Sequence, residues 1–128
     1  MSTRANVIIK DANTTLYFYR HSDGYPDHCG KDLVEFVKDY GKNGIMRSNA
    51  TQSAGWLIIR GHQEYLKSGF TNHPGYAWKV GAYEPTSDIH GDVEYIYTID
   101  LQWDCPLFEG IVPESGTLQF LFYGRVLE

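Results

Sequence analysis

The chain has 128 residues, of which 42% are hydrophobic and 15% aromatic, and its formal net charge at pH 7 is −5. A chain of this length and composition normally folds around one core, unlike the weakly hydrophobic, highly charged chains that stay disordered. The negative charge provides no broad cationic surface for phosphates, so it disfavours duplex nucleic acid as a partner. We expect a single domain over residues 1–128.

The sequence also indicates a compartment. Its first residues lack the basic region and apolar run of a signal peptide, and no segment approaches the roughly 20 apolar residues of a membrane span. Cys29 and Cys105 are too few for a disulfide framework and are expected to be free thiols. We therefore expect a cytoplasmic protein that does not contact a membrane.

The first half of the chain predicts a hairpin followed by two helices. Residues 5–10 and 14–20 are rich in β-forming residues and are joined by a short polar turn. A helix is predicted over residues 30–40, where apolar residues recur at helical spacing: Leu33, Phe36, Val37 and Tyr40. Just before it, Asp27 is the expected N-cap residue.

A second helix is predicted over residues 51–67, because one face of this segment is apolar. Gly55 and Gly61 weaken the prediction, since each glycine costs about 1 kcal/mol relative to alanine inside a helix. Either the backbone packs closely at these positions or the helix is shorter. The apolar run at 56–59 is also compatible with a buried strand.

Beyond residue 75 the pattern changes to strands, which we expect at 77–83, 93–101, 105–108 and 117–127. Between 93 and 101 apolar and polar residues alternate, which predicts one face in the core and the other in water. In the last strand the expected inner row is Leu118, Phe120, Phe122 and Val126. The predicted fold is α+β, a mostly antiparallel sheet in the order β-β-α-α-β-β-β-β with two helices packed on one face.

Two clusters of imidazole and carboxylate groups are the candidate functional residues. His90, Asp92 and Glu94 would point to one side of a strand with about 6.5 Å between neighbours. If His21 and Asp23 lay beside them, the group could hold zinc, manganese or iron, or bind a polar ligand. The spacing matches no standard metal motif, and a turn followed by a solvated strand edge explains the same residues.

The loop between the first hairpin and the first helix offers further candidates. Tyr25 lies in a turn, and Arg20 is expected either to pair with Asp92 or Glu94 or to stack on an aromatic ring. The start of the helix could hold an anion. A Cys29 thiolate activated by His28 is chemically conceivable, but a packed small residue is the more common use of such a cysteine.

Three stretches together resemble a group of small proteins encoded by tailed phages and prophages: the opening Met1-Ser2-Thr3-Arg4-Ala5-Asn6, the segment Tyr19-Arg20-His21-Ser22-Asp23-Gly24-Tyr25-Pro26, and Ile89-His90-Gly91-Asp92-Val93-Glu94-Tyr95-Ile96-Tyr97. The resemblance covers the first third of the chain and residues 81–101. It implies a phage or prophage setting and no catalytic residue.

In that setting we expect a non-enzymatic accessory protein that antagonises a host defence, either as an anti-CRISPR-like binder of a host protein or by sequestering a nucleotide signal. Its expected binding residues are Arg20, His21, Asp23, Tyr25, His90, Asp92 and Glu94. A metal-dependent hydrolase using the same clusters is the alternative, with a divalent metal as cofactor. A virion or DNA-metabolism accessory protein without a small-molecule site is the third interpretation. The sequence does not specify an oligomeric state.

Overall fold

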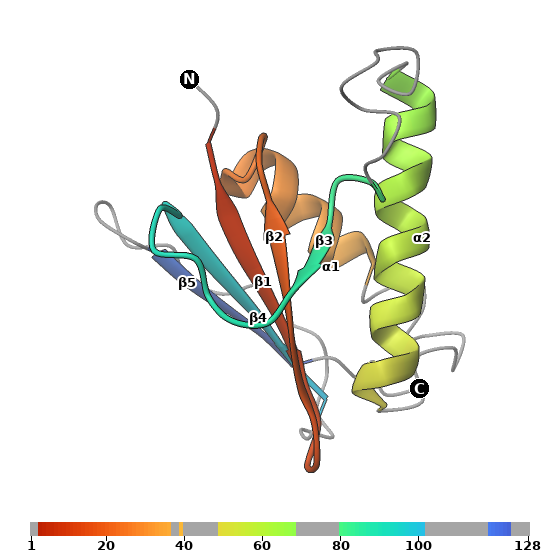
Figure 1. Cartoon of the computed structure of the whole chain (residues 1–128), viewed down its shortest axis with the longest axis vertical. Coiled ribbons are helices and arrows are strands. Elements are labelled where there is room, and N and C mark those ends of the chain that lie inside the picture. Colours follow the sequence, from red (N-terminus) through yellow and green to blue (C-terminus); the bar gives the residue numbers. More distant parts are fainter. Residues whose placement is uncertain (1–2, 37–38, 40–48, 69–79, 102–117, 124–128) are drawn as a thin grey trace.

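The structure is a computed structural model that describes residues 3–36, 39, 49–68, 80–101 and 118–123. Figure 1 shows a sheet with helices beside it. The elements, in chain order, are β1 (Ala5–Lys10), β2 (Thr15–Arg20), a π-helical turn η1 (Pro26–Gly30), α1 (Lys31–Phe36), α2 (Ala50–Ser68), β3 (Glu84–Thr86), β4 (Tyr95–Asp100) and β5 (Leu118–Tyr123). The predicted α+β class is confirmed.

The sheet is mixed, with strand order β3-β2-β1-β4-β5. β2 pairs antiparallel with β1 and β3, whereas β4 pairs parallel with β1 and β5. Two of the four described strand pairings are therefore parallel, whereas the sequence predicted a mostly antiparallel sheet. For β4 the reason is that residues 87–94 bring the chain back to the end of the sheet where β1 starts, so Tyr95 lies opposite Ala5.

Asp11 closes the predicted β1–β2 hairpin and links it to α2. Its backbone N–H donates to the carbonyl of Thr14, and its Oδ1 accepts the backbone N–H groups of Asn13 and Thr14. Its Oδ2 accepts the N–H of Ala50, the first residue of α2. The hydrogen bond from the Ala50 N–H is the largest cause of a lowered pKa at the Asp11 carboxyl, and the hydrogen bond from the Asn13 N–H is the next largest. The side chain of Asp11 thus accepts hydrogen bonds from backbone N–H groups in the turn and at the start of α2.

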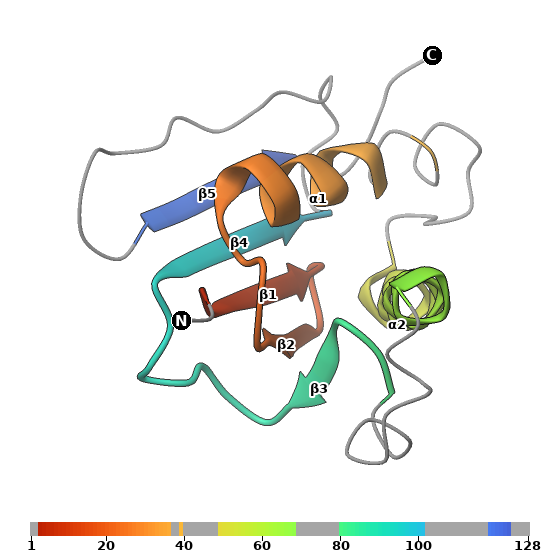
Figure 2. The same cartoon turned by 90° about the horizontal axis from the view of Figure 1, so that it is seen from above.

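The core lies on one face of the sheet, and both helices pack on that face, as predicted (Figure 2). Side chains along β1 alternate between the two faces, so Ala5, Val7 and Ile9 are fully buried beneath the helices. The helices and the neighbouring strands complete the core with Phe18, Leu33, Phe36, Leu57, Tyr97 and Ile99.

The first helical region begins earlier than predicted. Pro26 opens η1, which runs directly into α1, and the residue before it, Tyr25, provides no side-chain cap. The prediction of Asp27 as N-cap is wrong, because proline suits a first helical position and places Asp27 inside the first turn. The rest of the predicted 30–40 helix, except Asp39, lies outside the described residues.

The predicted second helix is confirmed as α2, and its two glycines differ. A Cβ on Gly61 would lie 2.9 Å from the backbone nitrogen of Tyr83, whereas a Cβ on Gly55 would meet no atom within 4 Å. Close packing therefore explains Gly61, and Gly55 has no such explanation in the structure. Asn49 stabilises the start of the helix, since its Oδ1 accepts the N–H groups of Thr51 and Gln52.

The predicted strand at 77–83 is not formed in its described part, residues 80–83, and β3 begins only at Glu84. The backbone of this segment is bonded to α2 instead: the N–H of Ala82 donates to the carbonyl of Gly61, and Nδ1 of His62 lies 2.9 Å from the carbonyl oxygen of Val80. These contacts replace strand pairing.

β5 confirms a strand within 117–127, but the side chains of its expected inner row and the strand predicted at 105–108 lie outside the described residues.

The second face of the sheet is less exposed than the alternation along β4 predicted. The inner row is buried as expected, with Tyr97 and Ile99 at 0% exposure, but Thr98 is only 3% exposed. On the same face, Asn6 and Tyr19 are also buried. Residues near His90 cross this face at Asn6 and Tyr19, and this crossing creates the candidate site.

Candidate functional site

Tyr19 is the centre of the candidate site, because side chains from three separate segments meet around it. The ring of His90 stacks on the Tyr19 ring at 4.1 Å between centroids, and the ring of His21 makes an edge contact at 4.5 Å. The Tyr19 hydroxyl donates to Oδ2 of Asp92 at 3.0 Å. The two predicted imidazole and carboxylate clusters therefore do converge. We call Tyr19, His21, Glu84, His90 and Asp92 the Tyr19 cluster.

A buried asparagine holds His90 in this cluster. Asn6 on β1 is fully buried opposite Tyr19; its Nδ2 donates to the carbonyl of Phe18, and its Oδ1 accepts the backbone N–H of His90 at 2.9 Å. Buried amides are retained where both ends are hydrogen-bonded. The sequence analysis missed Asn6, although a polar residue within an apolar strand was the available signal.

A hydrogen-bonding contact and an ion pair fix the rim of the cluster. Nε2 of His21 lies 2.7 Å from Oε2 of Glu84 on β3, and Nε of the exposed Arg4 lies 3.6 Å from Oδ2 of Asp92. Burial is the main cause of a raised pKa at Tyr19, and the hydrogen bond to Asp92 is the second cause. This phenol therefore remains a neutral donor. Glu84 was also missed by the sequence analysis, since only the β2–β3 pairing brings it to His21.

The predicted geometry of His90, Asp92 and Glu94 is wrong, although two of the three residues join the cluster. They precede β4, and residues 91 and 92 form a turn, so they do not alternate along a strand. The exposed Glu94 donates its backbone N–H to the carbonyl of Arg4. Gly91 favours the turn, because glycine weakens a strand and suits such conformations.

The predicted binding residues Asp23 and Tyr25 lie in the loop that follows His21. Asp23 has a positive φ of 57°, a left-handed conformation that aspartate tolerates in turns. Tyr25 is 39% exposed, and its ring makes an edge contact with His28 at 6.0 Å. Among the described residues, no hydrogen bond, ion pair or ring contact joins Asp23 or Tyr25 to Tyr19.

Arg20 lies on the opposite face of the sheet from Tyr19, because neighbouring strand residues point to opposite sides. It is 1% exposed and forms a bidentate pair with Glu64 of α2, at 2.6 Å from Nη2 to Oε2 and 3.2 Å from Nη1 to Oε1. The predicted pairing with Asp92 or Glu94 is therefore wrong. The predicted aromatic stacking is confirmed, with the guanidinium 4.9 Å from the centroid of the Tyr83 ring.

Cys29 is fully buried, and burial raises the pKa of its thiol to about 12. Such a thiol stays protonated at neutral pH, which contradicts the alternative of an activated nucleophile. His28, its suggested activator, has its Nε2 3.7 Å from Oε2 of Glu64. The structure therefore favours packing as the function of Cys29.

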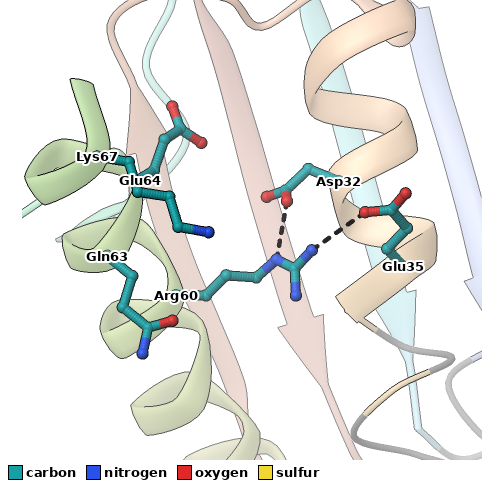
Figure 3. Close-up of a pocket in the computed structure, with 6 residues that line it drawn as sticks. All are labelled: Asp32, Glu35, Arg60, Gln63, Glu64 and Lys67. Atoms are coloured by element: carbon teal, nitrogen blue, oxygen red, sulfur yellow. Dashed lines mark hydrogen bonds and ion pairs between the residues drawn. The ribbon is translucent and has the colours of Figure 1, made fainter.

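A polar pocket of about 480 Å³ opens between α1 and α2 (Figure 3). Arg60 crosses it: its Nε bonds Oδ1 of Asp32 at 2.8 Å, and its Nη2 lies 3.4 Å from Oε2 of Glu35. The buried Tyr83 hydroxyl donates to Oδ2 of Asp32. The remaining described lining residues are Gln63, Glu64 and Lys67. These ion pairs connect α1 to α2 and indicate a structural network.

The described residues, 3–36, 39, 49–68, 80–101 and 118–123, contain neither a candidate metal centre nor a candidate membrane span. Within these ranges, no three His, Cys, Asp or Glu side chains are grouped so that they could hold a metal ion. Among the same residues, no helix combines the length and apolar character needed to cross a bilayer.

Comparisons of the chain with protein-family models, with curated proteins and with solved structures gave no significant match. The interpretation of the site therefore depends on the geometry of this chain.

Proposed function

We propose that this protein is a non-catalytic binding protein that recognises a host protein through the Tyr19 cluster. The observation that carries the proposal is the convergence of Tyr19 with Asp92, 73 positions later in the chain, and with the exposed His90. The buried Asn6 holds the backbone of His90, the ion pair with Arg4 holds Asp92, and Glu84 holds His21. These contacts keep His21, His90 and Asp92 at the surface, around the buried ring of Tyr19.

The arrangement suits recognition because its polar groups fix one another. His21 is engaged by Glu84, and Asp92 by the Tyr19 hydroxyl, so the rings and carboxylates keep one orientation before a partner arrives. Little side-chain entropy then has to be lost on binding. The accessible members of the cluster, His21, His90 and Asp92, are positioned by the buried Tyr19 ring and hydroxyl.

Charge favours a protein over a nucleotide as the ligand. The rim of the Tyr19 cluster carries the carboxylates of Glu84 and Asp92 with one exposed cation, Arg4. The pocket between α1 and α2 offers no better site for phosphates, since its described lining has three carboxylates, two cations and no aromatic side chain: Asp32, Glu35, Glu64, Arg60, Lys67 and Gln63. Phosphate recognition normally uses a surplus of cations or free backbone N–H groups.

The resemblance to phage and prophage proteins supplies the biological setting of the proposal. Small, acidic phage proteins without an enzyme motif often antagonise a host system by binding one of its proteins. We therefore propose a counter-defence function in the cytoplasm of the host.

The test is native mass measurement of tagged protein purified from its host, carried out in parallel on His90→Ala and Asp92→Asn. Matched controls are His62→Ala and Glu35→Gln, exposed residues on α2 and α1. The wild type and both controls should retain a host protein, and each cluster variant should reduce the retained fraction about tenfold or more, as expected for hot-spot residues. Equal retention by all five proteins, or a bound metal or nucleotide in place of a protein, would contradict the proposal.

A further inference from the structure

β3 covers only part of the outer edge of β2. β2 runs from Thr15 to Arg20, but β3 pairs only with Tyr17, Phe18 and Tyr19. After Thr86 the chain turns, and the Thr86 hydroxyl donates to the carbonyl of Asp88. Among the described residues, no strand pairs with the outer edge of β2 at Thr15.

The hydrogen-bond alternation shows which backbone groups face this edge. The N–H of Asp11 donates to the carbonyl of Thr14, so residues 9 and 16 form the next bonded pair, and the intervening Thr15 directs its N–H and C=O away from β1. The same alternation directs the N–H and C=O of Phe18 toward β1, which fits Pro85, a residue without an N–H, as its neighbour on β3. Thr15 therefore presents one donor and one acceptor outward.

An apolar groove of about 310 Å³ adjoins this open edge. Leu16 and Phe18 of β2 line one side, Ala54 and Ile58 of α2 line the other, and Pro85 of β3 lies at its end. Figure 1 shows β3 beside β2. We call the groove and the outward backbone groups of Thr15 the β2 notch.

We infer that the β2 notch binds an extended segment of the partner protein, which continues the line of β3 along β2. This inference rests on the proposed function and specifies how the partner binds. An extended backbone offers the matching acceptor and donor, and strand addition at an open sheet edge is a recurring mode of peptide recognition. A residue opposite Thr15 would exchange both hydrogen bonds, and the residue opposite Leu16 would direct its side chain into the groove.

The groove of the notch lies on the helix side of the sheet and the Tyr19 cluster on the other side, and the two approach each other only at the edge where β3 lies. β3 has three residues, so its ends are about 7 to 10 Å apart. Glu84 at one end belongs to the cluster, and Thr86 at the other end lines the notch. A partner that covers the sheet edge at β3 would therefore contact both.

The first test uses the peptide acetyl-Thr-Val-Thr-Val-Thr-amide, titrated into isotope-labelled protein and followed by NMR. The Thr15 amide should exchange at least tenfold faster than the Tyr17 amide in the free protein, and its exchange should slow about tenfold or more when peptide is bound. Two analogues, N-methylated at the valines or at the threonines, distinguish backbone pairing from apolar contact, because one of them lacks the donors that face β2. Protection of Thr15 without peptide, or equal binding of all three peptides, would overturn the inference.

Two variants keep the test independent of folding. Thr15→Pro removes the edge donor at the first residue of a strand, where proline is tolerated. Ala54→Leu fills the groove. Each folded variant should weaken peptide binding about tenfold, and thermal unfolding checks that it is folded.

His90→Ala should leave peptide binding unchanged while it reduces host-protein retention. Host retention without peptide binding would therefore refute the notch alone, and peptide binding without host retention would refute the proposed function.

Discussion

The pair between Arg20 and Glu64 shows how one buried charge depends on a residue 44 positions away. Arg20 is 1% exposed, so its guanidinium has lost most of its hydration and is compensated by Glu64, by the carbonyl of Ser22 and by the Tyr83 ring. We expect Glu64→Ala to lower the free energy of unfolding by roughly 3 kcal/mol, because it leaves a buried charge without its carboxylate. Urea denaturation measures the change.

Glu35 provides the control for this prediction. Its carboxylate also pairs with an arginine, Arg60, at 3.4 Å, but its side chain is 69% exposed. Solvent screens such a pair, so Glu35→Ala should change the free energy of unfolding by less than about 0.5 kcal/mol. Similar effects of the two substitutions would show that burial of Arg20 is not the source of the difference.

We expect the buried thiol of Cys29 to make the protein less stable at alkaline pH. Burial raises the pKa of its thiol from 9.0 to about 12, so above pH 9 the unfolded chain releases a proton that the folded chain retains. The stabilisation present below pH 9 should therefore decrease by about 1.4 kcal/mol per pH unit between pH 9 and pH 12. Unfolding of the wild type and Cys29→Ala, compared from pH 8 to pH 10.5, should give a shallower pH dependence for the variant. Parallel curves would contradict the prediction.

At the scale of elements, α2 offers a matched pair of substitutions. A Cβ on Gly61 would meet the backbone nitrogens of Tyr83 and Ala82 at 2.9 and 3.1 Å, and backbone atoms cannot move aside as a flexible side chain can. We expect Gly61→Ala to destabilise the protein by about 1 to 3 kcal/mol. Gly55→Ala meets nothing and should stabilise it by about 0.5 to 1 kcal/mol through helix propensity. Thermal and urea denaturation should give changes of opposite sign in the free energy of unfolding for the two substitutions. A more stable Gly61→Ala variant would contradict the close packing at this position.

The helix and hairpin were predictable because their signals are local. Asp11 with Asn13 marks the turn, and the apolar face of residues 51–67 marks α2. The strand expected at 77–83 failed for a non-local reason: Ala82 bonds to Gly61 of α2, and nothing in the sequence near Ala82 shows this partner.

At the scale of the whole molecule, β1 is the structural centre, since it pairs with β2 on one side and β4 on the other. Its core side chains Ala5, Val7 and Ile9 are fully buried. Amides of central strands open only with larger unfolding events, so those of β1 should exchange most slowly and those of the three-residue edge strand β3 fastest among β1, β2 and β3. Hydrogen exchange by NMR tests this order, and β3 amides as protected as those of β1 would contradict it.

The candidate site was predictable in part. The sequence selected His21, His90 and Asp92 as chemically capable residues and left open whether their segments meet. The contacts around Tyr19 show that they do. It assigned Arg20 to the same surface, yet strand alternation directs this residue to the helix side. It did not identify Glu84, whose position beside His21 depends on the pairing of β3 with β2.

By itself, therefore, the sequence determined the α+β class, the hairpin, the two helical segments and three residues of the Tyr19 cluster: His21, His90 and Asp92. These properties follow from turn chemistry and from periodicities that act over a few residues. Only the tertiary structure decided that β4 runs parallel to β1, that Asn6 holds the backbone of His90, and that the two clusters meet around Tyr19. Such contacts join residues far apart in the chain, and they form because burial and hydrogen bonding must be satisfied for the whole fold at once.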